Sequence, residues 1–147
     1  MSARKVELSI TIKTKPVKII QAFTEFGMLK DWWNVDRSYI DKRLGGTYTL
    51  IWGISDEGLK YVSTGIIDEY NPEQILKIKN LSYISTEHPV LGGMTLEIRV
   101  EKEPNENAKV YLCQDGYQNG KHWDWYYDAV SQAWPQMLNV LKDYLEK

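Results

Sequence analysis

The sequence predicts an α+β fold in which one long C-terminal helix covers an antiparallel sheet. Two observations lead to this prediction. In residues 122–147 the apolar side chains recur every three or four positions, which is the period of one helical face. Between residues 6 and 115, several segments alternate apolar and polar residues and are separated by short turns. Strands joined by short turns pair antiparallel, and only the C-terminal helix is long enough to cover their apolar face.

The C-terminal helix is expected to run from His122 to Lys147. Its apolar positions are Trp123, Tyr126, Tyr127, Val130, Trp134, Met137, Leu138, Leu141, Tyr144 and Leu145. Pro135 lies within this pattern, and proline removes one backbone hydrogen bond from a helix interior. Because the pattern stays in phase on both sides, we expect a kink between Ser131 and Trp134. The alternative is two helices, with Pro135 at the first position of the second.

The N-terminal part predicts one strand followed by two short helices. The strand is indicated by apolar residues that alternate with polar ones: Val6, Leu8, Ile10 and Ile12. A first helix is expected to begin at Pro16, to include Phe26 and to end at Gly27. A second helix is expected from Met28 to about Trp33. The second helix is too short to span a sheet, so the two helices form a connector rather than a crossover.

Six further strands are expected, which brings the sheet to seven. They fall at residues 36–44, 47–54, 61–70, 75–83, 94–101 and 108–115. Residues 88–93 contain one proline and two glycines, and we expect them to form a loop. Gly45 and Gly46 resemble a phosphate-binding loop only superficially, because no Lys-Ser/Thr pair follows and no helix begins there. A bulge or bend in the sheet is expected at these glycines instead.

Composition limits the classes of protein that the chain can belong to. Its 147 residues suffice for one domain with its own core, which we take to span residues 1–147. A net charge of -2 offers no basic patch for nucleic acid, and no stretch approaches the ~20 apolar residues of a membrane span. Cys113 is the only cysteine, so no internal disulfide is possible. The first residues lack the apolar segment of a signal peptide, and we expect a cytoplasmic protein.

Several short motifs, taken in order, resemble one protein family. They are Trp32-Trp33, the segments 44–48 and 65–72, Ile75-Leu76, and Trp134 with Leu138, Leu141 and Lys142. Over about Val6 to Leu145, the chain resembles the helix-grip fold of the START-like (SRPBCC, or Bet v one-like) superfamily. Within it, the chain is similar to the C-terminal-domain family of the activator of heat shock protein 90 ATPase. The resemblance implies a seven-stranded antiparallel sheet wrapped around the long helix. It also implies a cavity between them, which other members use for lipids, hormones and polyketides.

The chain departs from the family pattern in two ways. Pro135 directly follows the late tryptophan of the last helix, and Ala133 precedes that tryptophan where glycine is common. The eukaryotic co-chaperone also has an additional N-terminal domain, which contributes much of its chaperone contact and is absent from this sequence. A chaperone partner is therefore possible but not favoured, and we do not expect this chain alone to stimulate a chaperone ATPase strongly.

Aromatic residues supply the candidate binding site. Six Trp and ten Tyr accompany only two Phe, and Trp and Tyr carry polar groups that a dry core does not need. The expected aromatic walls of the cavity are Trp32, Trp33, Tyr48, Trp52, Tyr61, Trp123 and Tyr127. Neighbouring helical residues lie ~100° apart, so one of the two adjacent tryptophans can face the core and the other the cavity. The alternative is that these residues form an ordinary aromatic core.

Catalytic and metal sites receive little support from the residues. Cys113 with His122 and Asp115 is the one possible nucleophilic set, but a lone cysteine in a strand usually packs as a small hydrophobic residue. His88 and His122 are the only histidines and lie far apart in the sequence, with no other ligands at metal-binding spacing. We predict no catalytic residue, no metal and no cofactor.

The leading functional hypothesis is a module that binds a small apolar or aromatic ligand with a polar end. We expect a cavity of roughly 300–1,000 Å³ between the sheet and the C-terminal helix. One alternative is a protein-interaction module related to chaperone ATPase activators, and a second is a cyclase- or hydrolase-like enzyme that uses the same cavity. A large, aromatic-lined cavity would favour binding, a collapsed one interaction, and buried titratable groups catalysis. The oligomeric state is not indicated.

Overall fold

The computed structural model describes residues 4–147 and contains three helices and seven strands. The strands are β1 (Lys5–Ile12), β2 (Arg37–Ile40), β3 (Thr47–Trp52), β4 (Tyr61–Asn71), β5 (Ile75–Ser85), β6 (His88–Glu103) and β7 (Asn107–Asp115), and the helices are α1 (Pro16–Thr24), α2 (Phe26–Trp33) and α3 (Lys121–Leu145). All strands form one antiparallel sheet in the order β1-β7-β6-β5-β4-β3-β2. The predicted α+β, helix-grip arrangement is confirmed.

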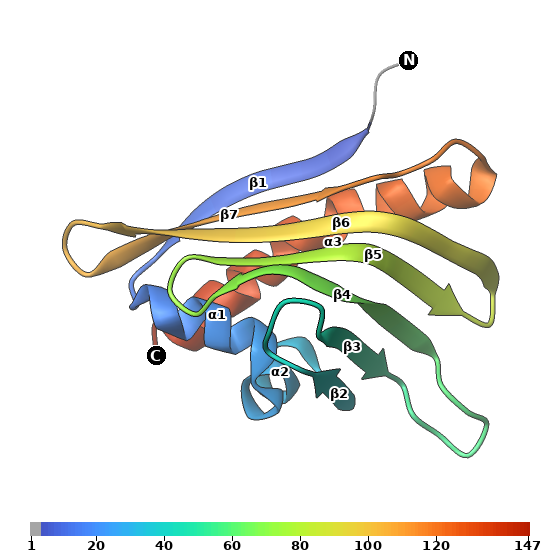
Figure 1. The fold of residues 1–147 in the computed structure, drawn as a ribbon, viewed down its shortest axis with the longest axis horizontal. Helices are drawn as coiled ribbons and strands as arrows, with labels where there is room; N and C mark the ends of the chain where they lie inside the picture. Colours follow the sequence, from blue (N-terminus) through green and yellow to red (C-terminus); the bar gives the residue numbers. More distant parts are fainter. Residues whose placement is uncertain (1–3) are drawn as a thin grey trace.

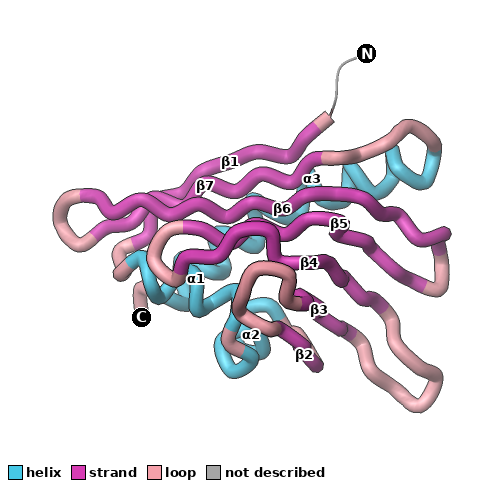
Figure 2. The backbone as a smooth tube through the Cα atoms, viewed as in Figure 1, coloured by secondary structure: helices cyan, strands magenta, loops and turns pink. Residues whose placement is uncertain are grey.

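The sheet and α3 form two layers, and α3 lies along one face of the curved sheet (Figure 1). The short helices α1 and α2 follow β1 and lie at one end of the molecule, beside β2 and the C-terminal half of α3 (Figure 2). The main core lies between these layers. Among its fully buried side chains are Ile12, Phe23, Leu76, Ile98 and Leu141.

The helix α3 is a single continuous helix that contains Pro135. The alternative of two helices that meet at this proline is therefore wrong, whereas the kink itself stays a prediction. The proline is tolerated because it lies on the exposed side of the helix, while Trp134, Leu138 and Leu141 on the opposite side are buried against the sheet. Trp134 therefore lies on the inner face, as the sequence predicts.

The boundary between the two short helices differs from the prediction. The first helix ends at Thr24, and Gly27 is the second residue of α2 rather than a helix terminator. Glu25 separates the helices because its backbone is extended, with φ -93° and ψ 125°. Its N–H donates to Gln21 of α1, and its carbonyl accepts from Leu29 of α2 at 2.9 Å. One residue thus serves as a cap for both helices.

The strand predicted at residues 36–44 is shorter, because β2 covers only Arg37–Ile40. The chain then turns tightly toward β3. A Cβ atom at Gly46 would lie 2.0 Å from the carbonyl oxygen of Asp41, so only glycine fits this bend. The predicted bend at the glycine pair is therefore confirmed. The next strand, β3, ends at Trp52 rather than at residue 54. The two residues after it, Gly53 and Ile54, donate their backbone N–H groups to the Asp36 carboxylate.

Residues 88–93 are not a loop, contrary to the prediction. They form the first part of β6, in which His88 pairs with Ser85 and Leu91 pairs with Tyr83. The pairing contains register shifts, and Gly93 adopts a φ of +89° that glycine accommodates without strain. The proline and the glycines therefore mark an irregular strand. Among the described residues, no helix is long and apolar enough to cross a membrane.

Two glycine substitutions test the close packing of β4 on β5. A Cβ atom at Gly65 would lie 2.6 Å from Ile78 and 2.9 Å from the Lys79 carbonyl oxygen. We expect Gly65→Ala to lower the free energy of unfolding by about 1–3 kcal/mol. Gly27 is exposed in α2 with nothing within 4 Å of the added atom, so Gly27→Ala should raise the free energy by about 0.5–1 kcal/mol. Urea unfolding measures the free energy of unfolding of each variant. Equal effects of the two substitutions would contradict the close approach of β4 and β5 at Gly65.

Candidate functional site

A cavity of about 460 Å³ lies between the concave face of the sheet and α3. Its volume falls within the predicted range, and most of its wall is aromatic or aliphatic. Helix residues that line it are Trp33, Trp125, Tyr126, Ala129, Val130, Ala133, Trp134 and Met137; residues from the sheet and its turns are Tyr48, Leu50, Trp52, Tyr61, Ser63, Leu81, Tyr83, Ser85, Glu87, His88, Leu96 and Gln114. Its exposed lining residues are Glu87 at one end and Trp125, Ala129 and Ala133 along α3.

Four of the seven predicted wall residues line this cavity. They are Trp33, Tyr48, Trp52 and Tyr61. Of the adjacent tryptophans, Trp33 faces the cavity, whereas Trp32 is buried in the core and donates from its indole nitrogen to the Ala22 carbonyl at 2.8 Å. The two side chains therefore divide between core and cavity, as the helical geometry predicts.

Trp123 and Tyr127 lie outside the cavity lining. Both pack around Tyr117, with ring centroids 6.3 and 5.1 Å from its ring. The Tyr127 hydroxyl donates to the Lys5 carbonyl at 3.4 Å, and this contact places the side chain toward β1. The apolar stripe of α3 is wide enough to serve both the cavity and this second cluster, so periodicity alone does not separate the two sets.

The deep end of the cavity is organised by the buried side chain of Gln114 on β7, which is 3% exposed. Its amide oxygen accepts a hydrogen bond from the indole nitrogen of Trp134 at 2.9 Å. Its amide nitrogen donates to the Tyr126 hydroxyl at 3.3 Å and approaches the Met94 sulfur at 3.6 Å. Because both ends of the amide are engaged, this side chain links α3 to the sheet.

Other polar groups near the deep end are also engaged by the protein. The Tyr48 hydroxyl donates to the Phe23 carbonyl at 2.6 Å, and the Trp52 indole nitrogen donates to the Trp33 carbonyl at 3.0 Å. Burial raises the pKa of Tyr48, and burial raises the pKa of Tyr126 to about 12. Both hydroxyls therefore stay protonated at neutral pH, and the walls present neutral aromatic rings.

Trp33 is the junction of these walls. Its ring centroid lies 5.1 Å from that of Trp32, 5.2 Å from that of Trp52 and 5.2 Å from that of Trp134. One side chain of α2 thus contacts a strand and α3 at once. Such edge-to-face and tilted pairs favour fixed ring orientations, so this wall of the cavity is preformed.

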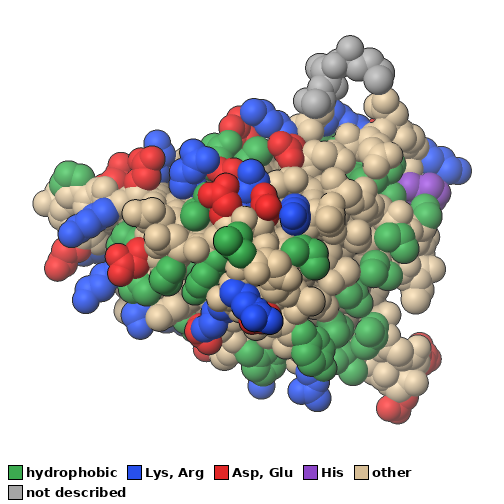
Figure 3. Space-filling model, in the orientation of Figure 1, with side chains coloured by type: hydrophobic (Ala, Val, Ile, Leu, Met, Phe, Trp, Pro, Cys, Tyr) green, Lys and Arg blue, Asp and Glu red, His purple; other side chains and the backbone are tan. Residues whose placement is uncertain are grey.

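The two histidines, His88 and His122, lie near the open end of the cavity. They are far apart in the sequence but in contact in the structure. The Nδ1 atoms of His88 and His122 lie 3.2 Å apart, and the His88 ring stacks on Trp125 with centroids 3.8 Å apart. Histidine side chains are visible at the right-hand edge of the molecule in Figure 3. Within residues 4–147, no group of three or more His, Cys, Asp or Glu side chains is placed to hold a metal ion.

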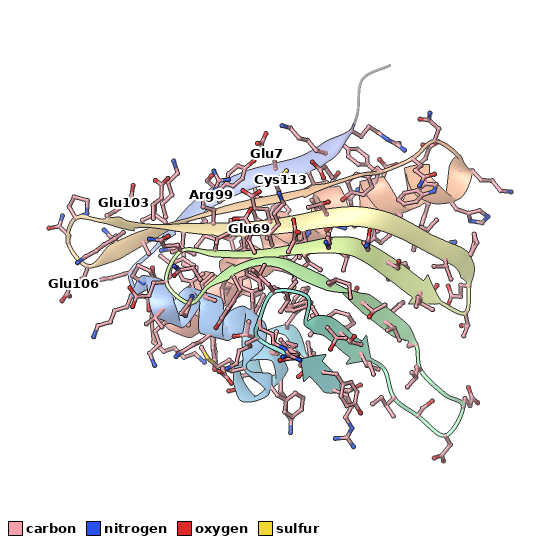
Figure 4. The ribbon with its side chains drawn as sticks, in the orientation of Figure 1. Glu7, Glu69, Arg99, Glu103, Glu106 and Cys113 are labelled. Atoms are coloured by element: carbon pink, nitrogen blue, oxygen red, sulfur yellow. The ribbon has the colours of Figure 1, made fainter. Side chains whose placement is uncertain are left out.

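The thiol of Cys113 does not belong to the cavity. Cys113 pairs with Glu7 across β1 and β7, and Figure 4 shows the two side chains near each other on these strands. Burial raises the pKa of the thiol, which keeps it protonated and weakly nucleophilic. Since His122 hydrogen-bonds with His88, the Cys113–His122 pair considered from the sequence does not form among the described residues.

Sequence reasoning missed several residues of the site. Tyr83 and Gln114 lie on strands that were predicted, but their strand faces were not assigned to the cavity, and Ser85 lies beyond the predicted end of its strand at residue 83. The alternation of Leu81, Tyr83 and Ser85 is the signal that places these three on one face. Nothing local indicates that His88 meets the start of α3, because that contact depends on the irregular first part of β6.

An antiparallel sheet that grips a C-terminal helix around an open cavity defines a START-like, helix-grip protein. Residues 13–146 match the model of the family described as "Activator of Hsp90 ATPase homolog 1-like protein". The chain belongs to this family, which confirms the resemblance. No curated protein matches the chain in sequence.

Solved structures with low sequence identity share the fold. The Aha1 dimer from Colwellia psychrerythraea is 19% identical, with a TM-score of 0.72 over 97% of this chain and 96% of that one. ChR145 from Cytophaga hutchinsonii is 20% identical, with a TM-score of 0.73 over 99% and 97%. CalU16 from Micromonospora echinospora is 17% identical, with a TM-score of 0.68 over 97% and 76%.

A double-mutant cycle tests the link between α3 and the sheet. Gln114→Leu leaves the buried Trp134 N–H without an acceptor and should lower the free energy of unfolding by about 1–3 kcal/mol. Trp134→Phe leaves the amide oxygen unpaired in turn. Urea unfolding of the double variant should show less than the sum of the single effects, by ~0.5 kcal/mol or more. Strict additivity would show that the hydrogen bond does not contribute.

Proposed function

We propose that this protein binds a small, mostly apolar or aromatic molecule with a polar end in the cavity between the sheet and α3. The open, aromatic-walled cavity of about 460 Å³ is the observation that carries the proposal. Ligand sites of this kind usually have volumes of ~300–1,000 Å³ and apolar walls with a few polar groups. Protein interiors otherwise pack densely, so an unfilled space of this size needs a reason.

The charges around the cavity support an uncharged or weakly polar ligand. Its lining contains no lysine or arginine, and Glu87 is the one acidic residue. A phosphate or another strong anion would meet no cation on the walls and would lie near a carboxylate at the open end. The apolar part of a ligand gains from burial against Trp33, Trp134 and their neighbours.

The open cavity ranks binding above the two alternatives. A module that acts only through its surface has no use for an interior space, and a collapsed cavity was the expected sign of that function. Acid–base catalysis needs a group that exchanges protons near neutral pH. The raised pKa values of Tyr48 and Tyr126 keep these wall hydroxyls protonated. The lining histidine, His88, already contacts His122 and Trp125.

Filling the cavity tests the proposal directly. The neutral probe N-phenyl-1-naphthylamine should bind saturably at micromolar concentration and quench tryptophan fluorescence. Ala133 lines the cavity from α3, so Ala133→Phe places a ring in the space and should weaken binding about tenfold or more. Fluorescence titration measures both.

The control places the same ring on the outside of the helix. Gln132 is exposed and does not line the cavity, so Gln132→Phe should bind the probe like the unmodified protein. Absence of saturable binding below millimolar probe, or equal loss in both variants, would contradict a ligand site here and favour the interaction module.

A further inference from the structure

The polar side chains of the cavity divide into two groups. At the deep end, the hydroxyl of Tyr48 and the indole of Trp134 each donate to a protein acceptor. Toward the open end, the hydroxyls of Tyr61 and Ser63 have no hydrogen-bond partner among the described residues. The Ser85 hydroxyl oxygen is buried beside the Tyr83 hydroxyl but makes no well-formed hydrogen bond to it or to another described group. Polar groups buried in a protein are normally paired, so the open end lacks something that the deep end does not.

The unpaired hydroxyls of Tyr61 and Ser85 lie beside His88 in a row across three neighbouring strands. Tyr61 of β4 is directly opposite Ser85 of β5, and Ser85 is directly opposite His88 of β6. Ser63 and Tyr83 form the next pair toward the interior. All five side chains line the cavity, so they form a polar row across its open end.

We propose that the row of Tyr61, Ser85 and His88 holds the polar end of the ligand, and that this end is an uncharged hydroxyl, as in an alcohol or a phenol. This inference rests on the proposed function and adds the chemistry and the direction of the bound molecule. Its apolar part lies at the deep end, against Trp134 and Met137, where the Trp134 indole already donates to Gln114.

The charges beside the row favour an uncharged polar end. The Lys60 ammonium lies 5.2 Å from the centre of the Tyr61 ring, and Glu87 lines the same end of the cavity. One charge of each sign leaves this end without a net charge that would select a charged ligand. A hydroxyl both donates and accepts hydrogen bonds, and it therefore matches two protein hydroxyls at once.

The Ser85 hydroxyl is covered by neighbouring side chains, so the ligand reaches it only when one of them moves. Tyr83 is the neighbour that can move, because it is half-buried and lies two residues away on the same strand face. Its ring contacts Tyr61 and Tyr126 with centroids 6.0 and 4.8 Å apart. In this proposal the ring, which also lies 6.3 Å from that of Trp125, rotates to let the ligand reach the serine oxygen.

Four ligands with the same apolar part test the proposal. They are butylbenzene, 4-butylphenol, 4-butylbenzoate and 4-butylbenzylamine, which present no polar group, a hydroxyl, an anion and a cation. By calorimetry at neutral pH, 4-butylphenol should bind roughly 3- to 10-fold more tightly than butylbenzene, the size expected for one neutral hydrogen bond. Both charged ligands should bind more weakly than the phenol.

Two variants remove one hydroxyl each, and each has a matched control. Ser85→Ala and Tyr61→Phe should reduce the advantage of the phenol over butylbenzene to less than about twofold. Ser82 on the same strand and Tyr39 on β2 do not line the cavity. Ser82→Ala and Tyr39→Phe should therefore preserve the advantage of the phenol over butylbenzene. Because the readout is a ratio of two ligands on one protein, a general loss of stability does not imitate the effect.

The direction of the bound phenol provides a second readout. Nuclear Overhauser contacts should join its butyl methyl group to the Met137 methyl group. Contacts from the butyl group to Trp125 at the open end would overturn the proposal. So would equal affinity for butylbenzene and the phenol, or a ratio unchanged in both variants, although the proposed function would stand. If N-phenyl-1-naphthylamine and all four ligands fail to bind, both proposals fail.

Discussion

The hydrogen bond between the Trp134 indole and the Gln114 amide holds the C-terminal helix at its distance from the sheet. The helix needs an attachment near its middle, and an apolar contact there would draw it closer and fill the space. A buried amide that is engaged at both ends attaches the helix at a fixed separation instead. The same amide also positions Tyr126, so one buried side chain of the sheet orients two aromatic residues of the cavity wall.

The second short helix contributes more to the cavity than its length suggests. It ends in two tryptophans, one of which seals the core while the other joins a strand to the long helix. Its orientation follows from Glu25, whose extended backbone turns the chain between two helices that are otherwise continuous. The extended backbone conformation of Glu25 thus helps to set the position of the aromatic side chains at the end of α2.

Periodicity was sufficient to predict the layers of the fold, because each strand and the long helix bury one face. It also placed Trp33, Tyr48, Trp52 and Tyr61 near the cavity, since these lie on regular elements. It failed at β6, where proline and glycine usually mark a loop but here accompany an irregular strand. The contact of His88 with His122 could not be predicted, because neither residue carries a local signal of the other.

Pro135 gives the long helix a property that a regular helix lacks. The Ser131 carbonyl has no backbone donor at residue 135, so the helix can change its angle at this point without breaking a hydrogen bond. The part before this point carries Trp125 and His122, and the part after it is packed by Leu138 and Leu141. Both parts are held to the sheet, the first by Tyr126 on Gln114 and by Asp124 on Arg4, so a bend at this point would let one helix follow a curved surface.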